Sequence, residues 1–371
     1  MIYSKKLLKY LALAAPLLSF QTANAQQEEP QTSIVDLGSV IKRDYTQSDF
    51  DLYYERIDTT YKKLGNDEIK TAIFVPKNLV NKKGGKNKKE VPLIVHWHGG
   101  GLIVGANPEP AWFANWVQEI PIVPSGTPSI LLSPAYRLAP ESKAIDSLHD
   151  VRDFWTWLHS TPSPLTDILK PYGVAPSLEQ ILTVGESAGG YLSLQSTLLY
   201  QNVSKVGAAV AQYPATYPEL WSNVTRPDNP AADKIIDDYV AALKPGAIRT
   251  STPYPALQDL TGAYLGTGRI LELYGNNEQE YEETTLRYAV SRGQKDLPPI
   301  WILQGTRDSI VPKPQADEVV RQIKEAYPDV KLKYTVRDGE HGWDSIYSLN
   351  RDWIAEGYEF VKKGWLKGKH H

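Results

Sequence analysis

Short apolar runs alternate with longer amphipathic segments from residue 91 to residue 365. The apolar runs are rich in β-branched residues and lack polar alternation, which is typical of strands covered on both faces. Strands are predicted over Pro92–Trp97, Ser129–Ser133, Ile181–Val184, Val206–Gln212, Pro299–Gln304 and Lys331–Val336. Helices are predicted over Ser142–His159, Ala188–Tyr200, Lys313–Ala326 and Ser345–Lys363. This alternation predicts an α/β fold with a mostly parallel central sheet flanked by helices.

Two segments fall outside this alternation. Residues 26–90 are polar and mixed, with short strands predicted over Asp49–Asp58 and Lys70–Pro76 and a solvated lysine-rich loop over Asn81–Glu90. Residues 214–296 are rich in proline, aromatic and charged residues, and the interval is too long for an ordinary connection in a compact domain. We expect it to be an inserted, largely helical cap. The alternative is a surface excursion with no role in a site.

Residues 1–25 have the layout of a secretory signal peptide. Lysines precede an apolar run from Tyr10 to Phe20, and Ala23-Asn24-Ala25 follows as a small-x-small cleavage pattern. Cleavage near Ala25 would give a secreted protein, or one in the lumen of the secretory pathway, with residues 26–371 as one domain. The alternative is an amphipathic or disordered N-terminal segment. The apolar run is too short to span a bilayer and no later stretch is suited to it, so we expect no stable membrane insertion.

Composition excludes several classes of function. The net charge of −3 and the near-neutral pI of about 6.2 argue against an electrostatic nucleic-acid binder. The chain has no cysteine, which excludes a thiol nucleophile, a zinc–thiolate site and a disulfide framework.

Two sequons, at Asn202 and Asn223, are candidate glycosylation sites in a eukaryotic secretory pathway.

The strongest local motif is Gly185-Glu186-Ser187-Ala188-Gly189-Gly190, between a predicted strand and a predicted helix. This is the context of a nucleophile elbow, in which the serine oxygen projects from a strained turn. The flanking glycines allow strand and helix to approach closely. Ser187 is therefore the candidate nucleophile, and the Ala188 amide would point to the place where an oxyanion forms.

A second motif, His98-Gly99-Gly100-Gly101, directly follows the predicted strand Pro92–Trp97. We expect the amides of Gly99 and Gly100 to form an oxyanion hole with that of Ala188. The alternative is a flexible turn after a buried strand. His96 and His98 form a His-x-His pair that could begin a metal site, but no further aspartate or histidine follows nearby to complete it, so no metal is predicted.

The acid and the base are expected later in the chain, in the order serine, acid, histidine. Asp308 follows the predicted strand Pro299–Gln304, and His341 follows the strand Lys331–Val336. Both therefore lie at carboxyl ends of strands, where open α/β sheets place their sites. Asp308 could instead be a turn residue, and Asp338 and Glu340 are alternative acids that lie close in sequence to His341. His149 and His159 fall in a helical pattern and are expected to be structural.

Proton transfers assign the roles. His341 would accept the proton of the Ser187 hydroxyl as its oxygen attacks an acyl carbonyl, and would then protonate the leaving alcohol. Asp308 would hold the required tautomer of the imidazole. Water would release the acyl group.

These residues resemble the hormone-sensitive-lipase-like branch of the α/β-hydrolases, which includes the arylacetamide deacetylases. The resemblance covers Val91 to about Trp365 and rests on the two motifs above, on Tyr136-Arg137-Leu138-Ala139-Pro140 and on the contexts of Asp308 and His341. It implies a carboxylesterase acting on small or medium acyl esters without a cofactor, with a cap built from residues 26–90 and 214–296. His98, Gly101 and Glu186 are expected to support the site. Many members have Asp or Thr before the nucleophile. The glutamate at this position, Glu186, is more similar to the type-B carboxylesterases.

Three functional hypotheses remain open. The first is a secreted carboxylesterase acting on a small-molecule ester. The second is a hydrolase or lyase acting on a specific natural product with the same triad and a specialised cap. The third is a non-catalytic binding protein on a hydrolase scaffold, which would be expected to have a damaged triad. A peptidase is less favoured, because peptide cleavage needs room for an extended chain.

Overall fold

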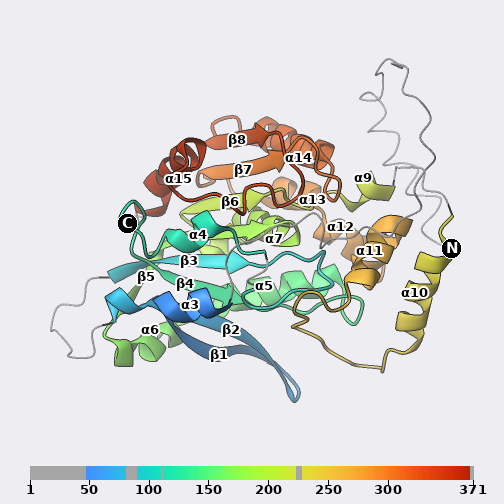
Figure 1. The fold of residues 1–371 in the computed structure, drawn as a ribbon, viewed down its shortest axis with the longest axis horizontal. Coiled ribbons are helices and arrows are strands. Elements are labelled where there is room, and N and C mark those ends of the chain that lie inside the picture. The colour runs from blue at the N-terminus through green and yellow to red at the C-terminus, as the bar shows by residue number, and fades with distance from the viewer. Residues whose placement is uncertain (1–46, 81–89, 110–111, 223–227, 368–371) are drawn as a thin grey trace.

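A sheet with the strand order β1-β2-β4-β3-β5-β6-β7-β8 runs through the described part of the chain (Figure 1). The computed structural model describes residues 47–80, 90–109, 112–222 and 228–367. The strand β2 is antiparallel to β1 and β4, and the other neighbouring strands are parallel. The predicted mostly parallel α/β sheet is confirmed. The predicted leader and nearly all of the predicted loop Asn81–Glu90 lie outside the described residues.

Each of the six strands predicted after residue 91 is present, as β3 to β8. The eight strands of the sheet are β1 (Tyr54–Leu64), β2 (Asp67–Pro76), β3 (Glu90–Trp97), β4 (Ile130–Pro134), β5 (Ala175–Glu186), β6 (Ala208–Gln212), β7 (Ile300–Gly305) and β8 (Leu332–Arg337). The assignment of all of residues 26–90 to a cap is wrong for β1 and β2, which form a hairpin at the edge of the sheet. The hairpin joins the sheet because Ile73 and Val75, on the inward face of β2, are buried in the main core.

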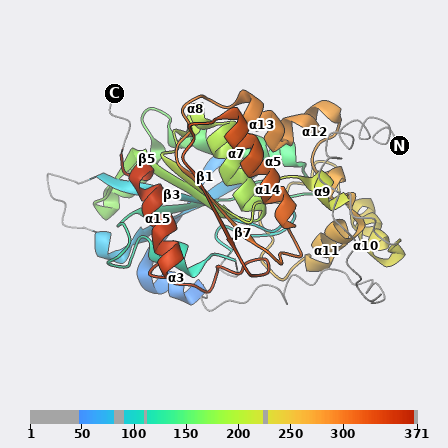
Figure 2. The same ribbon diagram turned by 90° about the horizontal axis from the view of Figure 1, so that it is seen from above.

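Helices cover both faces of the sheet (Figure 2). One face carries α5 (Ala144–Leu158), α7 (Ala188–Leu198) and α14 (Lys313–Ala326), and the other carries α3 (Gln47–Tyr53), α4 (Asn115–Glu119) and α15 (Asp352–Trp365). The short helices α6 (Pro164–Leu169) and α8 (Gln201–Ser204) complete the body. The helix α15 begins later than predicted. Ser348 Oγ and the Leu349 amide both donate to Glu119 Oε2 at 2.7 Å, which fixes the preceding turn in a non-helical path.

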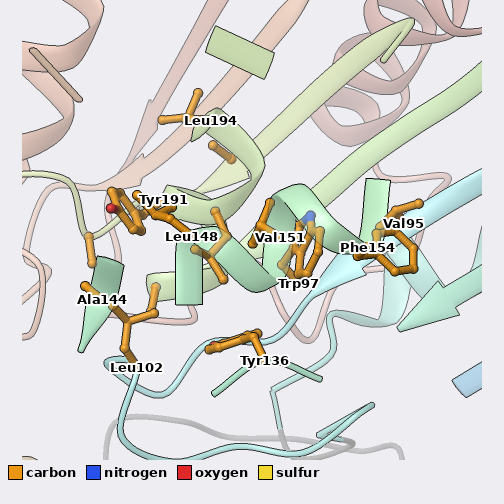
Figure 3. Close-up of a cluster of buried hydrophobic side chains, with 14 of the residues drawn as sticks. Val95, Trp97, Leu102, Tyr136, Ala144, Leu148, Val151, Phe154, Tyr191 and Leu194 are labelled. Atoms are coloured by element: carbon orange, nitrogen blue, oxygen red, sulfur yellow. The ribbon is translucent and has the colours of Figure 1, made fainter. Parts of the chain in front are cut away.

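Alternate residues of the strands enter two separate cores. Val95 and Trp97 of β3 face the core under α5 and α7, whereas Ile94 faces the core under α4 and α15. Figure 3 shows the first core, in which Trp97 lies against the ring of Phe154 at a centroid distance of 5.4 Å. Full burial of such a side chain contributes about 1.5–3 kcal/mol. This packing fixes the end of β3, from which the glycine motif continues.

The interval 214–296 is largely helical but has two parts. Its helices are α9 (Pro218–Ser222), α10 (Pro230–Ala241), α11 (Gln258–Thr267), α12 (Glu278–Thr284) and α13 (Leu286–Arg292). The helices α10 and α11 pack on each other and lie beyond the end of the sheet toward which β3 points (Figure 1). By contrast, α12 and α13 pack on α5, α7 and α14 of the body. We use the word cap for α10 and α11.

Candidate active site

Ser187 lies in a sharp turn between β5 and α7. Its backbone has φ 56° and ψ −120°, a conformation that an L-residue adopts only when its surroundings impose it. The Ser187 amide donates to the carbonyl of Gln212 at 2.9 Å, and the Ser187 carbonyl accepts from the amides of Tyr191 and Ala215, each at 3.1 Å. These bonds, from α7 and from the end of β6 and the residues after it, hold the serine at the rim of the sheet, with 8% of its surface exposed.

The two glycines around the serine are required by close backbone contacts. A Cβ atom at Gly189 would lie 1.9 Å from the carbonyl oxygen of Trp97, and one at Gly185 would lie 2.3 Å from the carbonyl oxygen of Gly189. No side chain fits in either place. The strand–turn–helix context that the motif predicted is therefore present, and the glycines allow the close approach of strand and helix.

Asp308 and His341 form a buried pair. Asp308 Oδ2 lies 2.9 Å from His341 Nδ1, and the two residues are 6% and 4% exposed. Asp308 Oδ1 accepts from the amides of Ile310 and Val311 at 3.0 and 2.7 Å, and Oδ2 also lies 3.2 Å from Gln304 Nε2. These donors orient the carboxylate, which in turn fixes the imidazole so that Nε2 faces away from Asp308.

The alternative acids have other partners. Asp338 accepts from Arg307 Nε at 2.7 Å, and Glu340 Oε2 accepts from the amide and the hydroxyl of Ser309 at 3.1 and 3.0 Å. Both contacts are exposed to solvent. Asp308 is therefore the carboxylate that the structure brings to His341. His159 lies just past α5, where its Nε2 is 2.9 Å from the carbonyl of Ser204.

Ser187 and His341 line the same cavity. The cavity is lined by Gly99, Gly100, Gly101, Trp112, Glu186, Ser187, Tyr213, Ala215, Thr261, Leu265, Ile310, Val311, His341 and Gly342. Its volume is about 40 Å³, which is room for only a few water molecules. Thr261 and Leu265 come from α11, so the cap forms part of the wall. The walls are mainly apolar, which suits a small uncharged group.

The glycine motif differs from expectation at its first glycine. The Gly99 amide donates to Glu186 Oε1 at 2.9 Å, so it does not point into the cavity as an oxyanion donor. The reason is the acidic side chain at 186, which reaches from β5 to the end of β3. Within the described part of the chain, the amides of Gly100, Gly101 and Ala188 have no hydrogen-bond acceptor. Gly100 and Gly101 have φ of 96° and 65°, a region that favours glycine.

Glu186 also binds the first histidine of the His-x-His pair. Its Oε2 lies 2.7 Å from His96 Nε2, and both side chains are buried. This arrangement clamps β5 to β3 beside the nucleophile. Glu186 and Gly101 thus both lie at the site that we expected them to support.

His98 contacts backbone atoms and Tyr136. Its Nδ1 lies 2.9 Å from the carbonyl of Gly99, and its ring stacks on that of Tyr136 at 4.3 Å. Burial lowers the pKa of His98 to about 4, so its imidazole is neutral at physiological pH. In the described ranges there is no group of three or more His, Cys, Asp or Glu residues placed to hold a metal ion.

Two further residues at the site were not predicted. The backbone carbonyl of Gln212, the last residue of β6, accepts a hydrogen bond from the Ser187 amide. The ring of Tyr213 lies 4.5 Å from that of His341. The position of both at the end of a predicted strand was the available signal. Of the two sequons, Asn202 is exposed in α8 and Asn223 lies outside the described residues.

The family of the chain follows from a comparison with known protein families. A sequence profile of the family described as alpha/beta hydrolase fold matches residues 94–344. The chain belongs to this family. The match spans the glycine motif, Ser187, Asp308 and His341, so the resemblance inferred from these motifs is confirmed.

The relatives of this α/β hydrolase include carboxylesterases. It is 26% identical over 322 residues to "Probable carboxylesterase M8" of Phoma sp., an alignment covering 84% of this chain and 97% of the relative. It is 30% identical over 199 residues to "Probable carboxylesterase clz11" of Cochliobolus lunatus, covering 49% of this chain and 86% of the relative. The protein is therefore a carboxylesterase-like hydrolase.

Solved structures share the fold. An esterase of Pyrobaculum calidifontis is 18% identical with a TM-score of 0.52, over 83% of this chain and 85% of that one. Native esterase 2 of Thermogutta terrifontis is 18% identical with a TM-score of 0.51, over 85% of this chain and 95% of that one. At these identities the likeness establishes the fold alone. In the ranges that the structure describes, no helix is long and apolar enough to cross a membrane.

Proposed function

We propose that the protein is a serine hydrolase of carboxylic esters in which Ser187 is the nucleophile, His341 the general base and Asp308 the acid that orients it. The observation that carries this proposal is the pairing of Asp308 Oδ2 with His341 Nδ1 at 2.9 Å beside a cavity lined by both His341 and Ser187. A histidine held in this way presents Nε2 as the proton acceptor.

The reaction follows from these positions. His341 Nε2 takes the hydroxyl proton of Ser187 as Oγ attacks the acyl carbon, and the imidazolium that forms is stabilised by Asp308. The carbon–alkoxide bond then breaks, the departing oxygen takes the proton from His341, and the acyl group remains on Ser187. A water molecule, deprotonated by the same imidazole, hydrolyses the acyl-enzyme.

The tetrahedral oxyanion would be stabilised by the amides of Gly100, Gly101 and Ala188. The set expected from the sequence had Gly99 in place of Gly101. Gly99 is left out because its amide is bound to Glu186. Removal of one such donor costs about 2.7–4 kcal/mol of transition-state stabilisation in other hydrolases. Ala188 is the first residue of α7, so its amide lies at the positive end of the helix dipole.

The proposed substrates are uncharged esters with a short acyl group. The cavity of about 40 Å³ has mainly apolar walls, and both oxygens of Glu186 already have hydrogen-bond partners. No carboxylate is left to bind a cationic substrate in the described lining. An acetyl or propionyl ester therefore fits this cavity better than a long-chain lipid.

The test is hydrolysis of p-nitrophenyl acetate by the purified protein. We expect wild-type turnover, no turnover above background with Ser187→Ala, and a loss of about 10⁴-fold with Asp308→Asn. Asp338→Asn is the matched control, since its carboxylate pairs with Arg307 and not with His341, and it should keep wild-type kcat. Turnover that persists in Ser187→Ala, or that is lost on adding a chelator, would contradict the proposal.

We also propose that the protein is secreted after cleavage near Ala25, since residues 1–25 have the three-part layout of a leader. The exposed Asn202 is the candidate site for a glycan. Mass spectrometry of protein from the culture medium should give an N-terminus near Gln26. An intact Met1 in a protein that stays inside the cell would contradict this localisation.

A further inference from the structure

We propose that Asp344 is a positioning residue that ties the loop carrying His341 to the strand end that holds Ser187. This inference rests on the proposed function, because it assigns Ser187 and His341 to the reaction. Asp344 lies three positions after His341 and is fully buried. Asp344 does not itself line the described cavity.

The partners of Asp344 come from two other segments. Its Oδ2 accepts from Trp116 Nε1 of α4 at 3.0 Å and from Gln212 Nε2 at the end of β6 at 2.7 Å. One carboxylate oxygen thus joins three segments that are far apart in the sequence. Two donors directed at one acceptor fix both the carboxylate and the loop on which it lies.

Gln212 connects this contact to the nucleophile. Its side chain donates to Asp344, and its backbone carbonyl accepts the Ser187 amide at 2.9 Å. Gln212 therefore has the loop of His341 on one side and the turn of Ser187 on the other. A displacement of Gln212 would move the carbonyl that holds the amide of the strained serine.

Tyr213 connects the same contact to the base. It directly follows Gln212, whose side chain binds Asp344, and its ring lies 4.5 Å from the His341 ring. Asp344 consequently has a route to Ser187 through Gln212 and a route to His341 through Tyr213. These are the two side chains whose separation decides proton transfer.

A simple packing role does not account for a carboxyl group at this place. Burial raises the pKa of Asp344 above its ordinary value, although the hydrogen bonds that its Oδ2 accepts from Trp116 and Gln212 act to lower it. Burying the group therefore costs free energy, and an apolar residue of the same shape would fill the space without that cost. The hydrogen bonds are what the carboxyl group adds.

The first test compares Asp344→Asn with Asp344→Leu, which have nearly the same shape. The Asn side chain keeps an oxygen acceptor for Gln212 and Trp116, whereas Leu removes it. We expect Asp344→Asn to keep kcat within about threefold, and Asp344→Leu to lower kcat about 10–100-fold with KM little changed, because small misplacements of reacting groups have effects of this size. Rates are expressed per folded molecule, from active protein counted by a fluorophosphonate.

The second test approaches the contact from Gln212 and has a matched control. Gln212→Met removes the bond to Asp344 but keeps the backbone carbonyl that binds the Ser187 amide. Gln201→Met removes an equivalent buried bond, from Gln201 Nε2 to the Val206 carbonyl at 3.0 Å, at a distance from the site. We expect Gln212→Met to lower kcat and the rate of fluorophosphonate labelling in parallel by about tenfold. Gln201→Met should leave both unchanged.

The outcomes separate the two proposals. If Asp344→Leu does not fold, Gln212→Met decides alone. Wild-type kcat in Gln212→Met, or equal losses in Gln212→Met and Gln201→Met, would overturn the positioning role while wild-type labelling at Ser187 leaves the hydrolase proposal intact. Greater activity in Asp344→Leu than in Asp344→Asn would likewise overturn it. Absence of labelling in the wild type would instead refute the assignment of Ser187.

Discussion

A methyl group added at Gly100 should disable the proposed oxyanion hole. A Cβ atom there would lie 2.1 Å from the carbonyl oxygen of Val104 and 2.9 Å from Cζ3 of Trp112. The φ of 96° is also unfavourable for alanine. Val104 cannot easily move away, since its own amide donates to the Gly100 carbonyl at 3.0 Å. Gly100→Ala must therefore shift the loop and its amides.

The size of the effect follows from the donor that is displaced. Loss of one oxyanion donor lowers kcat about 10²–10³-fold, and we expect Gly100→Ala to fall in this range. Gly101→Ala should be milder, because its Cβ would meet only Cγ2 of Thr261 at 3.5 Å, an ordinary contact. There the cost is mainly that of a left-handed alanine, about 1–2 kcal/mol of stability, and kcat should stay within about tenfold of wild type.

Gly65 supplies the control for backbone strain. Its φ of 61° is close to that of Gly101, and nothing lies within 4 Å of its Cβ position. Gly65→Ala should therefore lose about 1–2 kcal/mol of stability and keep wild-type kcat. The measurements are kcat and KM for p-nitrophenyl acetate, with urea unfolding of each variant. If Gly100→Ala keeps kcat within threefold of wild type, the proposed donor set is wrong.

Three further predictions concern the clamp that Glu186 forms with His96 and the Gly99 amide, the buried His98, and the cavity. Glu186→Ala, which frees the Gly99 amide, should lower kcat about tenfold, while Glu186→Gln keeps an acceptor and loses less; equal activity in both would refute the clamp. The pKa of His98 falls from 6.5 to about 4 on folding, so its contribution to stability is complete above pH 6.5 and is lost as the pH falls toward 4. In urea unfolding, the wild type should therefore lose about 3 kcal/mol more than His98→Gln between pH 7 and pH 4, and equal losses would contradict this. The cavity of about 40 Å³ predicts that p-nitrophenyl octanoate has a kcat/KM about 10–100-fold below that of the acetate; a flat profile across chain lengths would contradict this.

The sheet was predictable because its strands are buried on both faces. Apolar runs such as Pro92–Trp97 and Pro299–Gln304 have no polar alternation that could suggest another structure. The hairpin of β1 and β2 was harder, because β1 is an edge strand with many half-exposed residues. The predicted strand Asp49–Asp58 is wrong over its first half, which belongs to the helix α3, and the alternation did not predict the place of the hairpin in the central sheet.

The motifs identified which residues meet at the site, since each follows a strand and parallel strands end at one rim. They did not specify the hydrogen bonds. Gly99 is followed by two more glycines, and the sequence does not distinguish the three amides. The Gly99 amide is lost to the cavity because it donates to the side chain of Glu186 on β5. Asp344 was missed for a related reason, because its partners lie 228 and 132 positions away in the chain.

The most direct measurement of the central claim is the site of a covalent adduct. The purified protein is treated with a fluorophosphonate, digested, and analysed by mass spectrometry. We predict a single adduct on Ser187, formed at a rate that falls about as steeply as kcat in Asp308→Asn and that is unchanged in Asp338→Asn. An adduct on another residue, or labelling of Ser187 that does not depend on Asp308, would contradict the account.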